Sequence, residues 1–450
     1  MGILTNLFRA DRRLELRNVF STFFKNSSTG GIVLMICAIA AIMIANVPAF
    51  SHLHSYLEQY AGFSFGGYEF KMSIMHWIND GLMAVFFLVV GLEIKREILV
   101  GELSSIKQAA LPIFAAVGGM VVPALIYVGF NWNSESANGW GIPMATDIAF
   151  ALGILSLLGK RVPVSLKIFL TALAIVDDLG AIVVLAIFYP THAIDFTLLM
   201  YAGLILGLLI SFNALNIRKP AFYIVPGIVL WFLFLGSGIH ATIAGVLVAM
   251  TIPGKNTINE VRFLVGCRYL LNKFSAASNH KVQVLANQEQ QQIIHHLHNK
   301  LKQVHPLMIK FEHGLHPWVT FFIMPVFALA NAGVVMNLSL FTPPLPPIVP
   351  GIFLGLLAGK PLGIFVASWL AVRFKIAELP ADVSWGQIFS AGIIAGIGFT
   401  MSIFIDNLAF TDAAMIDMGK ATILVTSFAA AVLGLIAIYI TTKDKKIINQ

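Results

Sequence analysis

The chain has 450 residues, of which 58% are hydrophobic and only 11% are charged, and its mean hydropathy is +0.84. Soluble domains carry about 25% charged residues, so this composition excludes an ordinary soluble enzyme and indicates an integral membrane protein. The formal net charge of +7 does not indicate nucleic-acid binding, because the basic residues fall in short clusters between apolar runs. The only cysteines, Cys37 and Cys267, provide no disulfide framework.

Apolar runs follow one another along most of the chain after a basic, amphipathic N-terminal segment. That segment lacks the pattern of a cleaved signal peptide, so we expect it to stay in the cytoplasm. A run of about 20 apolar residues crosses the roughly 30 Å of hydrocarbon in a bilayer, and we expect about twelve transmembrane helices. The runs lie near 30–48, 74–94, 108–130, 140–158, 165–189, 196–216, 221–236, 239–252, 315–335, 348–372, 386–406 and 418–440.

Lysine and arginine are concentrated in alternate connections between these runs. On the other connections, the first carries only Lys71, and three more carry neither lysine nor arginine. The positive-inside rule therefore places both termini in the cytoplasm. The expected organisation is an N-terminal segment (1–29), eight helices (30–252), a cytoplasmic polar loop (253–312), four helices (313–441) and a cytoplasmic tail (442–450).

The polar loop 253–312 is predicted to have helical character and contains the stretches N-Q-E-Q-Q-Q and H-H-L-H. Its histidines are candidates either for a metal site or for a solvated helix surface. No partner ligands at zinc spacing accompany them, which favours the solvated surface. These residues are His295, His296 and His298.

Two of the predicted spans are poor helices. Residues 140–158 have Pro143 just ahead of Thr146 and Asp147, and residues 391–404 include Gly396 and Gly398. A membrane tolerates interrupted helices only where the freed backbone groups are buried in protein or line a cavity. These spans are the fourth and the eleventh, the middle members of two triplets with opposite predicted orientation, as in the inverted repeats of secondary transporters.

Asp177 and Asp178 lie near the middle of the apolar run 165–189. A carboxylate at the centre of a membrane helix costs about 2.5–3.5 kcal/mol on insertion scales, which indicates a functional role. Neighbouring residues on a helix point about 100° apart, so we expect one aspartate to face a counter-charge and the other a water-filled cavity. Lys360 is the expected counter-charge. The alternative is a purely structural ion pair, which one lysine cannot complete with two or three carboxylates.

Several other ionisable residues within the spans allow two interpretations each. Asp147 is either part of an ion site or a compensation for helix dipoles. Asp80 either caps a helix start or supports function, and His240 either makes a buried hydrogen bond or responds to pH. A solvated helix end is the first interpretation for Glu93, Lys95, Arg96 and Glu97.

Carboxylates and backbone carbonyls suit hard cations, and no thiolate or histidine cluster in the sequence indicates a transition metal. Competition between Na⁺ and H⁺ for the same carboxylates, exposed alternately to each side of the membrane, is sufficient for antiport. The sequence has no phosphate-binding G-x-x-x-x-G-K-[ST] stretch, so we expect neither ATP nor another cofactor.

The chain closely resembles the NhaA family of bacterial sodium/proton antiporters. The resemblance rests on seven stretches that reach from the second span to the tenth: H-W-I-N-D-G-L-M-A-V-F-F-L-V-V-G-L-E-I-K-R-E, M-A-T-D-I-A-F-A-L-G, A-L-A-I-V-D-D-L-G-A-I, G-S-G-I-H-A-T-I-A-G-V, H-G-L-H-P-W-V, F-A-L-A-N-A-G-V and A-G-K-P-L-G-I. It implies an all-α inner-membrane protein of twelve helices, with inverted repeats and two broken, crossing helices, that exports Na⁺ or Li⁺ in exchange for two protons.

The resemblance also assigns residues to roles. Asp178 is similar to the essential cation-binding carboxylate, Asp177 to its companion that pairs with Lys360, and Asp147 and Thr146 to the residues at the helix crossing. The implied ligands of sodium are thus Asp177 and Asp178. The residues that resemble the family's cytoplasmic pH-sensing cluster are Glu93, Arg96, Glu97, Glu312, His313 and His316.

Family members dimerise, commonly through a β-hairpin between the first two spans, and residues 63–71, with alternating aromatics around Gly66 and Gly67, are the expected hairpin. The main departure from the family is the polar loop before Glu312, which is longer than usual. This length affects the expected pH response more than transport.

An intramembrane protease is the enzyme alternative. An aspartyl form needs G-x-G-D and aspartates on different helices, whereas here the two acids are neighbours and the motif is absent. A serine form needs G-x-S-G, but Leu235 stands where its first glycine belongs.

A cation channel is the other alternative, since the same acids could line a pore. A channel needs a continuous polar stripe or a selectivity loop, and the spans offer only isolated charges.

Overall fold

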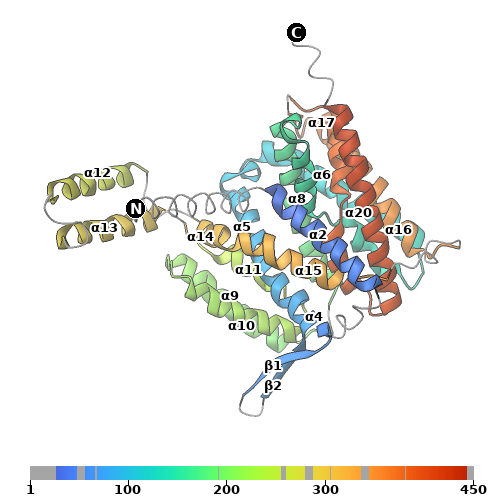
Figure 1. Cartoon of the computed structure of the whole chain (residues 1–450), viewed down its shortest axis with the longest axis horizontal. Coiled ribbons are helices and arrows are strands. Elements are labelled where there is room, and N and C mark those ends of the chain that lie inside the picture. The colour runs from blue at the N-terminus through green and yellow to red at the C-terminus, as the bar shows by residue number, and fades with distance from the viewer. Residues whose placement is uncertain are drawn as a thin grey trace, which may run out of the picture.

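The computed structural model describes residues 27–47, 56–65, 68–190, 192–254, 260–278, 287–304, 306–335, 344–380 and 382–442. Within these ranges the chain is almost entirely helical (Figure 1). The expected N-terminal segment up to residue 26 and the tail from residue 443 lie outside the described residues.

Eight described helices are long and apolar enough to cross a membrane, and the bent pair Trp385–Ala395 and Phe399–Ala409 raises the number to nine. The predicted number of twelve is therefore not confirmed. The other predicted runs form helices that are shorter or more charged: α5 (Met83–Val100) has four charged residues, α10 (Ala221–Ser237) has 17 residues and α11 (Ile243–Thr251) has nine.

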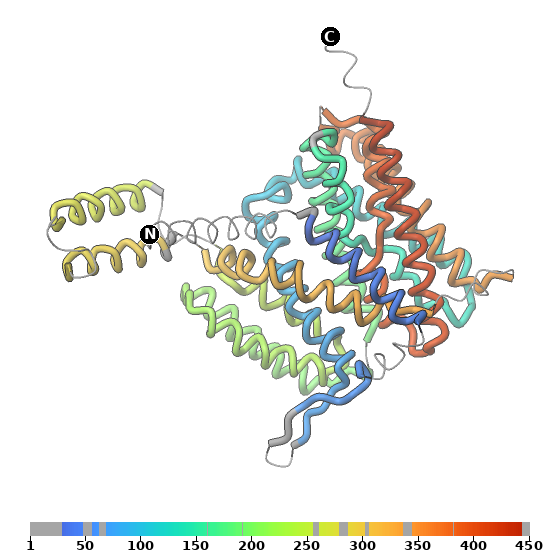
Figure 2. The backbone as a smooth tube through the Cα atoms, in the orientation of Figure 1, coloured from blue at the N-terminus to red at the C-terminus, as the bar shows by residue number. Residues whose placement is uncertain are grey.

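The spanning helices gather around two hydrophobic cores (Figures 1 and 2). The larger core draws on α2 (Ser27–Asn46), α6 (Ile106–Asn131), α8 (Val164–Phe188), α20 (Ala413–Thr441) and the broken spans. The smaller core is formed mainly by α10, α11, α9 (Phe196–Ala214) and the start of α14 (Leu307–Trp318). Because α5 contributes Phe87 to the first core and Leu92 to the second, it joins the two.

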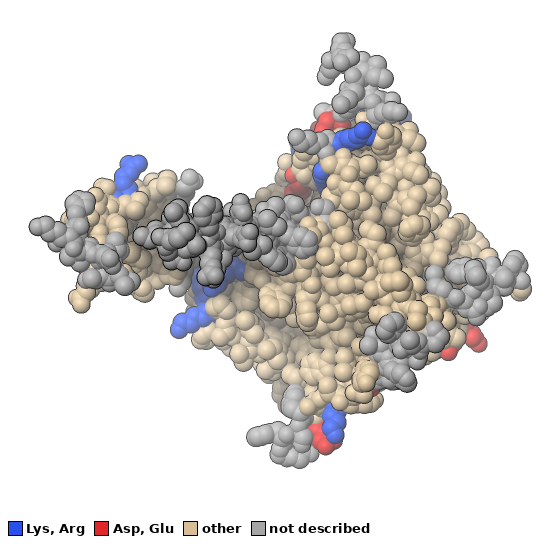
Figure 3. Space-filling model, in the orientation of Figure 1, with Lys and Arg blue, Asp and Glu red and all other residues tan. Residues whose placement is uncertain are grey.

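The outer face of the larger core is almost free of charge. In Figure 3, lysine, arginine, aspartate and glutamate lie at the margins of the face that is formed by α2, α15 (Met324–Asn331) and α20. Exposed apolar side chains such as Ile36, Met43 and Phe428 cover it. Such a surface is stable in contact with lipid, which agrees with the predicted membrane protein.

Both predicted breaks are present. The fourth span is a 3₁₀ helix, η4 (Ala137–Met144), then extended residues 145–147, then α7 (Ile148–Leu157). The eleventh is α18 (Trp385–Ala395) and α19 (Phe399–Ala409), bent by 49°. An inverted-repeat relationship between the two triplets stays a prediction.

In the described residues, three π-helical turns that the sequence did not predict interrupt other spans. They are η2 (Trp77–Leu82) between α4 (Ile74–His76) and α5, η7 (Val319–Ile323) between α14 and α15, and η9 (Gly355–Gly359) between α16 (Ile348–Leu354) and α17 (Lys360–Arg373). Such turns occur often at functional sites, and η9 leads directly into Lys360.

Helices α6 and α17 pack in backbone contact at Gly118 and Gly363. A Cβ atom on Gly118 would lie 2.3 Å from the carbonyl oxygen of Gly363, and one on Gly363 would lie 2.1 Å from the carbonyl oxygen of Gly118. Small residues allow this approach between membrane helices. Since Lys360 begins α17 three residues before Gly363, the contact also fixes where the lysine side chain enters the core.

The expected hairpin and the helical character of the polar loop are both confirmed. Strands β1 (Tyr60–Phe65) and β2 (Tyr68–Ser73) pair antiparallel with Phe65 opposite Tyr68, and the turn at Gly66 and Gly67 lies outside the described residues. The polar loop contains two helices, α12 (Glu260–Ala276) and α13 (Gln288–Val304), which pack on each other beside the bundle (Figure 2).

We expect Gly118→Ala to lower the free energy of unfolding by about 1–3 kcal/mol, because its methyl group must push α17 away. The measurement is thermal unfolding of the purified protein in detergent. Gly129→Ala is the matched control on the same helix, where a Cβ atom would meet nothing within 4 Å. Equal stability of the two variants would contradict the packing argument.

Candidate functional site

The two broken spans cross where they leave helical geometry, and Asp147 lies at the crossing. Its N–H donates to the carbonyl oxygen of Ile397 at 2.8 Å. Its carboxylate accepts the N–H of Phe150 at 2.9 Å, in the first turn of α7. The same carboxylate accepts the N–H of Thr400 at 3.2 Å and the Thr400 hydroxyl, in the first turn of α19. One carboxylate thus caps the N-termini of both half-helices, which favours dipole compensation over ligation as the role of Asp147.

The carbonyl ends of the other half-helices are satisfied by donors from the same crossing. The Thr146 hydroxyl donates to the carbonyl oxygen of Ala395, the last residue of α18, at 2.9 Å. The Lys360 ammonium donates to the carbonyl oxygen of Met144, the last residue of η4. A positive charge therefore lies at the negative end of η4 and a negative charge at the positive ends of α7 and α19.

Asp177 is the aspartate that faces the counter-charge. Its Oδ2 lies 2.7 Å from the Lys360 ammonium, and both side chains are buried, with 1% and 0% exposed. The predicted contact between Asp177 and Lys360 is therefore present in the structure. A buried pair of this kind is stable only while both charges are kept, because removing one partner leaves the other uncompensated in a medium of low polarity.

Asp178 differs from its neighbour in having no counter-charge of its own. It is 2% exposed, and its Oδ1 has no hydrogen-bond partner among the described residues. Three carboxylates act on its charge unfavourably, those of Asp177, Asp147 and Glu93, while Lys360 acts favourably. Asp178 is thus the acid whose negative charge the surrounding residues leave unbalanced.

Thr400 is a residue of the crossing that the sequence analysis missed. It binds Asp147 through both its hydroxyl and its N–H. The sequence did contain a signal for this role, because Thr400 is a hydroxyl residue two positions after Gly398 and so lies in the first helical turn after the break. The predicted supporting glycines allow close approach: a Cβ atom would lie 2.5 Å from the Leu356 carbonyl oxygen at Gly396 and 2.1 Å from the Ser402 hydroxyl at Gly398.

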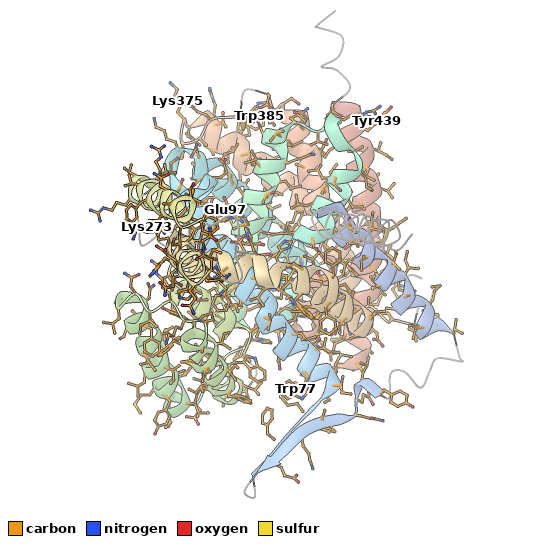
Figure 4. The ribbon with its side chains drawn as sticks, turned by 60° about the vertical axis from the view of Figure 1, so that its left-hand side comes forward. Trp77, Glu97, Lys273, Lys375, Trp385 and Tyr439 are labelled. Carbon is orange, nitrogen blue, oxygen red and sulfur yellow. The ribbon has the colours of Figure 1, made fainter. Side chains whose placement is uncertain are left out.

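A second charged cluster joins α5 to α14 and matches the residues that resemble the pH-sensing set. Arg96 forms an ion pair with Glu312 and a second, at 3.1 Å, with Glu97. Electrostatic interactions connect the remaining members to these, namely Glu93, His313 and His316. Figure 4 shows Glu97 toward the end of the molecule where Lys375 lies, and away from Trp77 beside the hairpin. This agrees with the cytoplasmic side that the basic connections indicate.

His240 does not belong to that cluster. Its Nε2 lies 3.7 Å from Oδ1 of Asp80, and its Nδ1 lies 2.8 Å from the Thr242 hydroxyl. Asp80 precedes Glu93 by thirteen residues, about 20 Å along a helix, so the two groups respond to different surroundings. The interpretation of Asp80 as a cap at a helix start is wrong, because α4, η2 and α5 follow one another without a break.

The histidines of the polar loop lie on α13, and the described part of the chain contains no group of three or more histidine, cysteine or acidic side chains placed to hold a metal ion. His295, His296 and His298 are exposed, as a solvated helix surface requires.

Comparison with known proteins identifies the family of the chain. The profile of the family described as Na⁺/H⁺ antiporter 1 matches residues 21–438. The chain belongs to this family. It is 49% identical to the Na⁺/H⁺ antiporter NhaA of Oleidesulfovibrio alaskensis over 91% of each chain. It is 46% identical to that of Wolinella succinogenes over 96% of this chain and 95% of the relative. The seven stretches resembled the NhaA family, and membership of this family is therefore confirmed.

We expect Lys360→Met to lower the free energy of unfolding by about 3–5 kcal/mol, because Asp177 would be left buried without a counter-charge. Adding Asp177→Asn removes that charge and should restore most of the loss. Thermal unfolding of the purified variants at neutral and alkaline pH measures both effects. If the double variant is no more stable than Lys360→Met, the ion pair is not the reason for the loss.

Proposed function

We propose that this protein is a secondary transporter that exchanges Na⁺ or Li⁺ for protons across the bacterial inner membrane, and so serves pH and sodium homeostasis. Membership of the antiporter family supports the exchange of Na⁺ and H⁺. The unbalanced charge of Asp178 is the observation in the structure that carries the proposal.

A count of charges at the crossing explains the choice of Asp178. Each helix N-terminus carries about half a positive charge, so the two ends at Asp147 together balance one carboxylate. Lys360 balances Asp177. Asp178 remains, and a carboxylate in so buried a place must bind either a proton or a cation.

Competition between Na⁺ and a proton for Asp178 produces the exchange of one for the other. When the site is open to the cytoplasm, Na⁺ displaces the proton, and when it is open to the other side, protons displace Na⁺. We propose that Asp177, released from Lys360 in part of the cycle, supplies a second oxygen ligand to Na⁺ together with Asp178, and that a second proton is exchanged there. Two protons for one Na⁺ move one net charge, so the membrane potential contributes about 2.3 kcal/mol per 100 mV.

We further propose that the cluster around Arg96 and Glu312 regulates transport by pH, with His240 as a separate pH-responsive group. The β-hairpin is proposed to hold a homodimer together in the lipid bilayer, with both termini in the cytoplasm. The exposed edges of β1 and β2 support this role, because paired strands can extend a sheet across a dimer.

We expect the protein in liposomes to move protons out of the lumen when Na⁺ or Li⁺ is added to the bath, because the cation enters in exchange, and Asp178→Asn to abolish this movement. A dye inside the liposomes follows the pH. Asp417→Asn, which removes an exposed acid on α20, is the matched control and should retain exchange. Cation flux without proton counterflow would instead favour the channel.

We expect Glu312→Gln to shift the dependence of antiport on pH toward alkaline values by about one unit while the maximal rate is kept. The amide mimics the protonated carboxyl, which cannot hold the ion pair with Arg96, so the state found at acidic pH persists to higher pH. Rates in liposomes across the pH range measure the shift.

Glu69→Gln, at an exposed glutamate of the hairpin, is the control for that variant and should leave the pH profile unchanged. An unshifted profile in Glu312→Gln would remove the cluster from pH regulation.

A further inference from the structure

Asp406 is a buried acid that lies outside the site described above. It is on α19, six residues beyond Thr400 and hence about 9 Å farther along the helix from the crossing. Its side chain is 0% exposed, and both carboxylate oxygens lack a hydrogen-bond partner among the described residues. The proposed antiport cycle does not use it.

The surroundings of Asp406 are shaped to receive its carboxylate. A Cβ atom on Gly419 of α20 would lie 2.0 Å from Oδ1 of Asp406, so the absence of a side chain at Gly419 leaves room for the carboxylate against α20. Any larger residue would displace the acid from its place between the two helices.

Among the described residues, the charged groups that act on Asp406 come from α20, and Tyr127 of α6 is a further ionisable group that faces it. Lys420 acts favourably on the charge of Asp406 and Asp417 acts unfavourably. Lys420 is half-buried and Asp417 is exposed. Tyr127 of α6 also faces the acid, but its hydroxyl donates to the carbonyl oxygen of Ser136 at 2.7 Å. Lys420 is therefore the only positive charge among these neighbours.

We infer that Asp406 is a second proton-binding site, separate from Asp177 and Asp178, at which a proton and the Lys420 ammonium compete for one carboxylate. A buried carboxylate without hydrogen bonds costs several kcal/mol unless its charge is cancelled. A proton cancels it by binding, and Lys420 cancels it by moving closer. A metal cation is excluded as the ligand, because a hard cation takes several oxygen ligands and the ammonium of Lys420 would repel it.

The position of Asp406 on α19 links this proton site to the crossing. The start of the helix is bound to Asp147 through Thr400, and its far end faces Lys420. Proton binding at Asp406 removes the electrostatic attraction between Asp406 on α19 and Lys420 on α20. It therefore changes the interactions that position α19, which forms half of the crossing. This link to access rests on the proposed antiport, whereas the proton site itself does not.

Infrared difference spectroscopy of the purified full-length protein tests the proton site without Na⁺ and without transport. Spectra recorded between acidic and alkaline pH report carboxyl groups that gain or lose a proton. We expect a band of a buried carboxyl group in the parent that is lost in Asp406→Asn and kept in both Asp417→Asn and Asp178→Asn. A spectrum of Asp406→Asn identical to that of the parent would overturn the inference.

Lys420→Gln provides a second test that does not depend on the folding of Asp406→Asn. Without the competing ammonium, the carboxyl group should hold its proton to a higher pH, and the titration of its band should move by at least about one unit. An unmoved band would overturn the competition. Because Asp178→Asn separately tests antiport in liposomes, failure of the proposed function and failure of this inference give different results.

Discussion

The structure depends on one interaction, the binding of the Asp147 carboxylate to the N-termini of α7 and α19. Breaking two membrane helices at the same depth leaves unpaired N–H and C=O groups in a place without water, at a cost of several kcal/mol for each unsatisfied group. Two N-termini with about half a positive charge each are balanced by one carboxylate. The N–H of Asp147 and the carbonyl oxygen of Ile397 join the same breaks by a backbone hydrogen bond.

The same requirement explains where Lys360 lies. The carbonyl end of η4 needs a donor, and the ammonium satisfies Met144 and Asp177 together. Its place is set from two directions, by the π-helical turn η9 that precedes it and by the contact of Gly118 with Gly363 that follows. Because the charges of the half-helix ends and of Asp177 are balanced in this way, the only unbalanced charge among the described residues of the crossing is that of Asp178. A crossing that is otherwise neutral leaves Asp178 as the carboxylate for the proposed exchange of a proton for a cation.

The centre of the site could be predicted from the sequence because a charge within an apolar run is conspicuous. Asp177, Asp178 and Lys360 are such charges. The proline and glycine residues in two spans likewise predicted both helix breaks. Thr400 was missed because a threonine is not conspicuous in such a run, and its role depends on a half-helix 253 residues away. The π-helical turns were missed because one added residue in a turn hardly changes an apolar pattern. Asp406 was missed because it lies near the end of its run, where an acid normally indicates a helix that is leaving the membrane.

The place of α5 connects the charged cluster to the crossing. Glu93 lies between them: it interacts electrostatically with Glu312 and Arg96 at one end and with Asp178 at the other. In a medium of low polarity such interactions act over longer distances than in water. A change of charge at Glu312 therefore alters the balance at Asp178 through Glu93 without any movement of the backbone. Since α5 packs in both hydrophobic cores, the same helix can also transmit a displacement from α14 to the larger core. The structure thus provides both an electrostatic and a mechanical connection along α5.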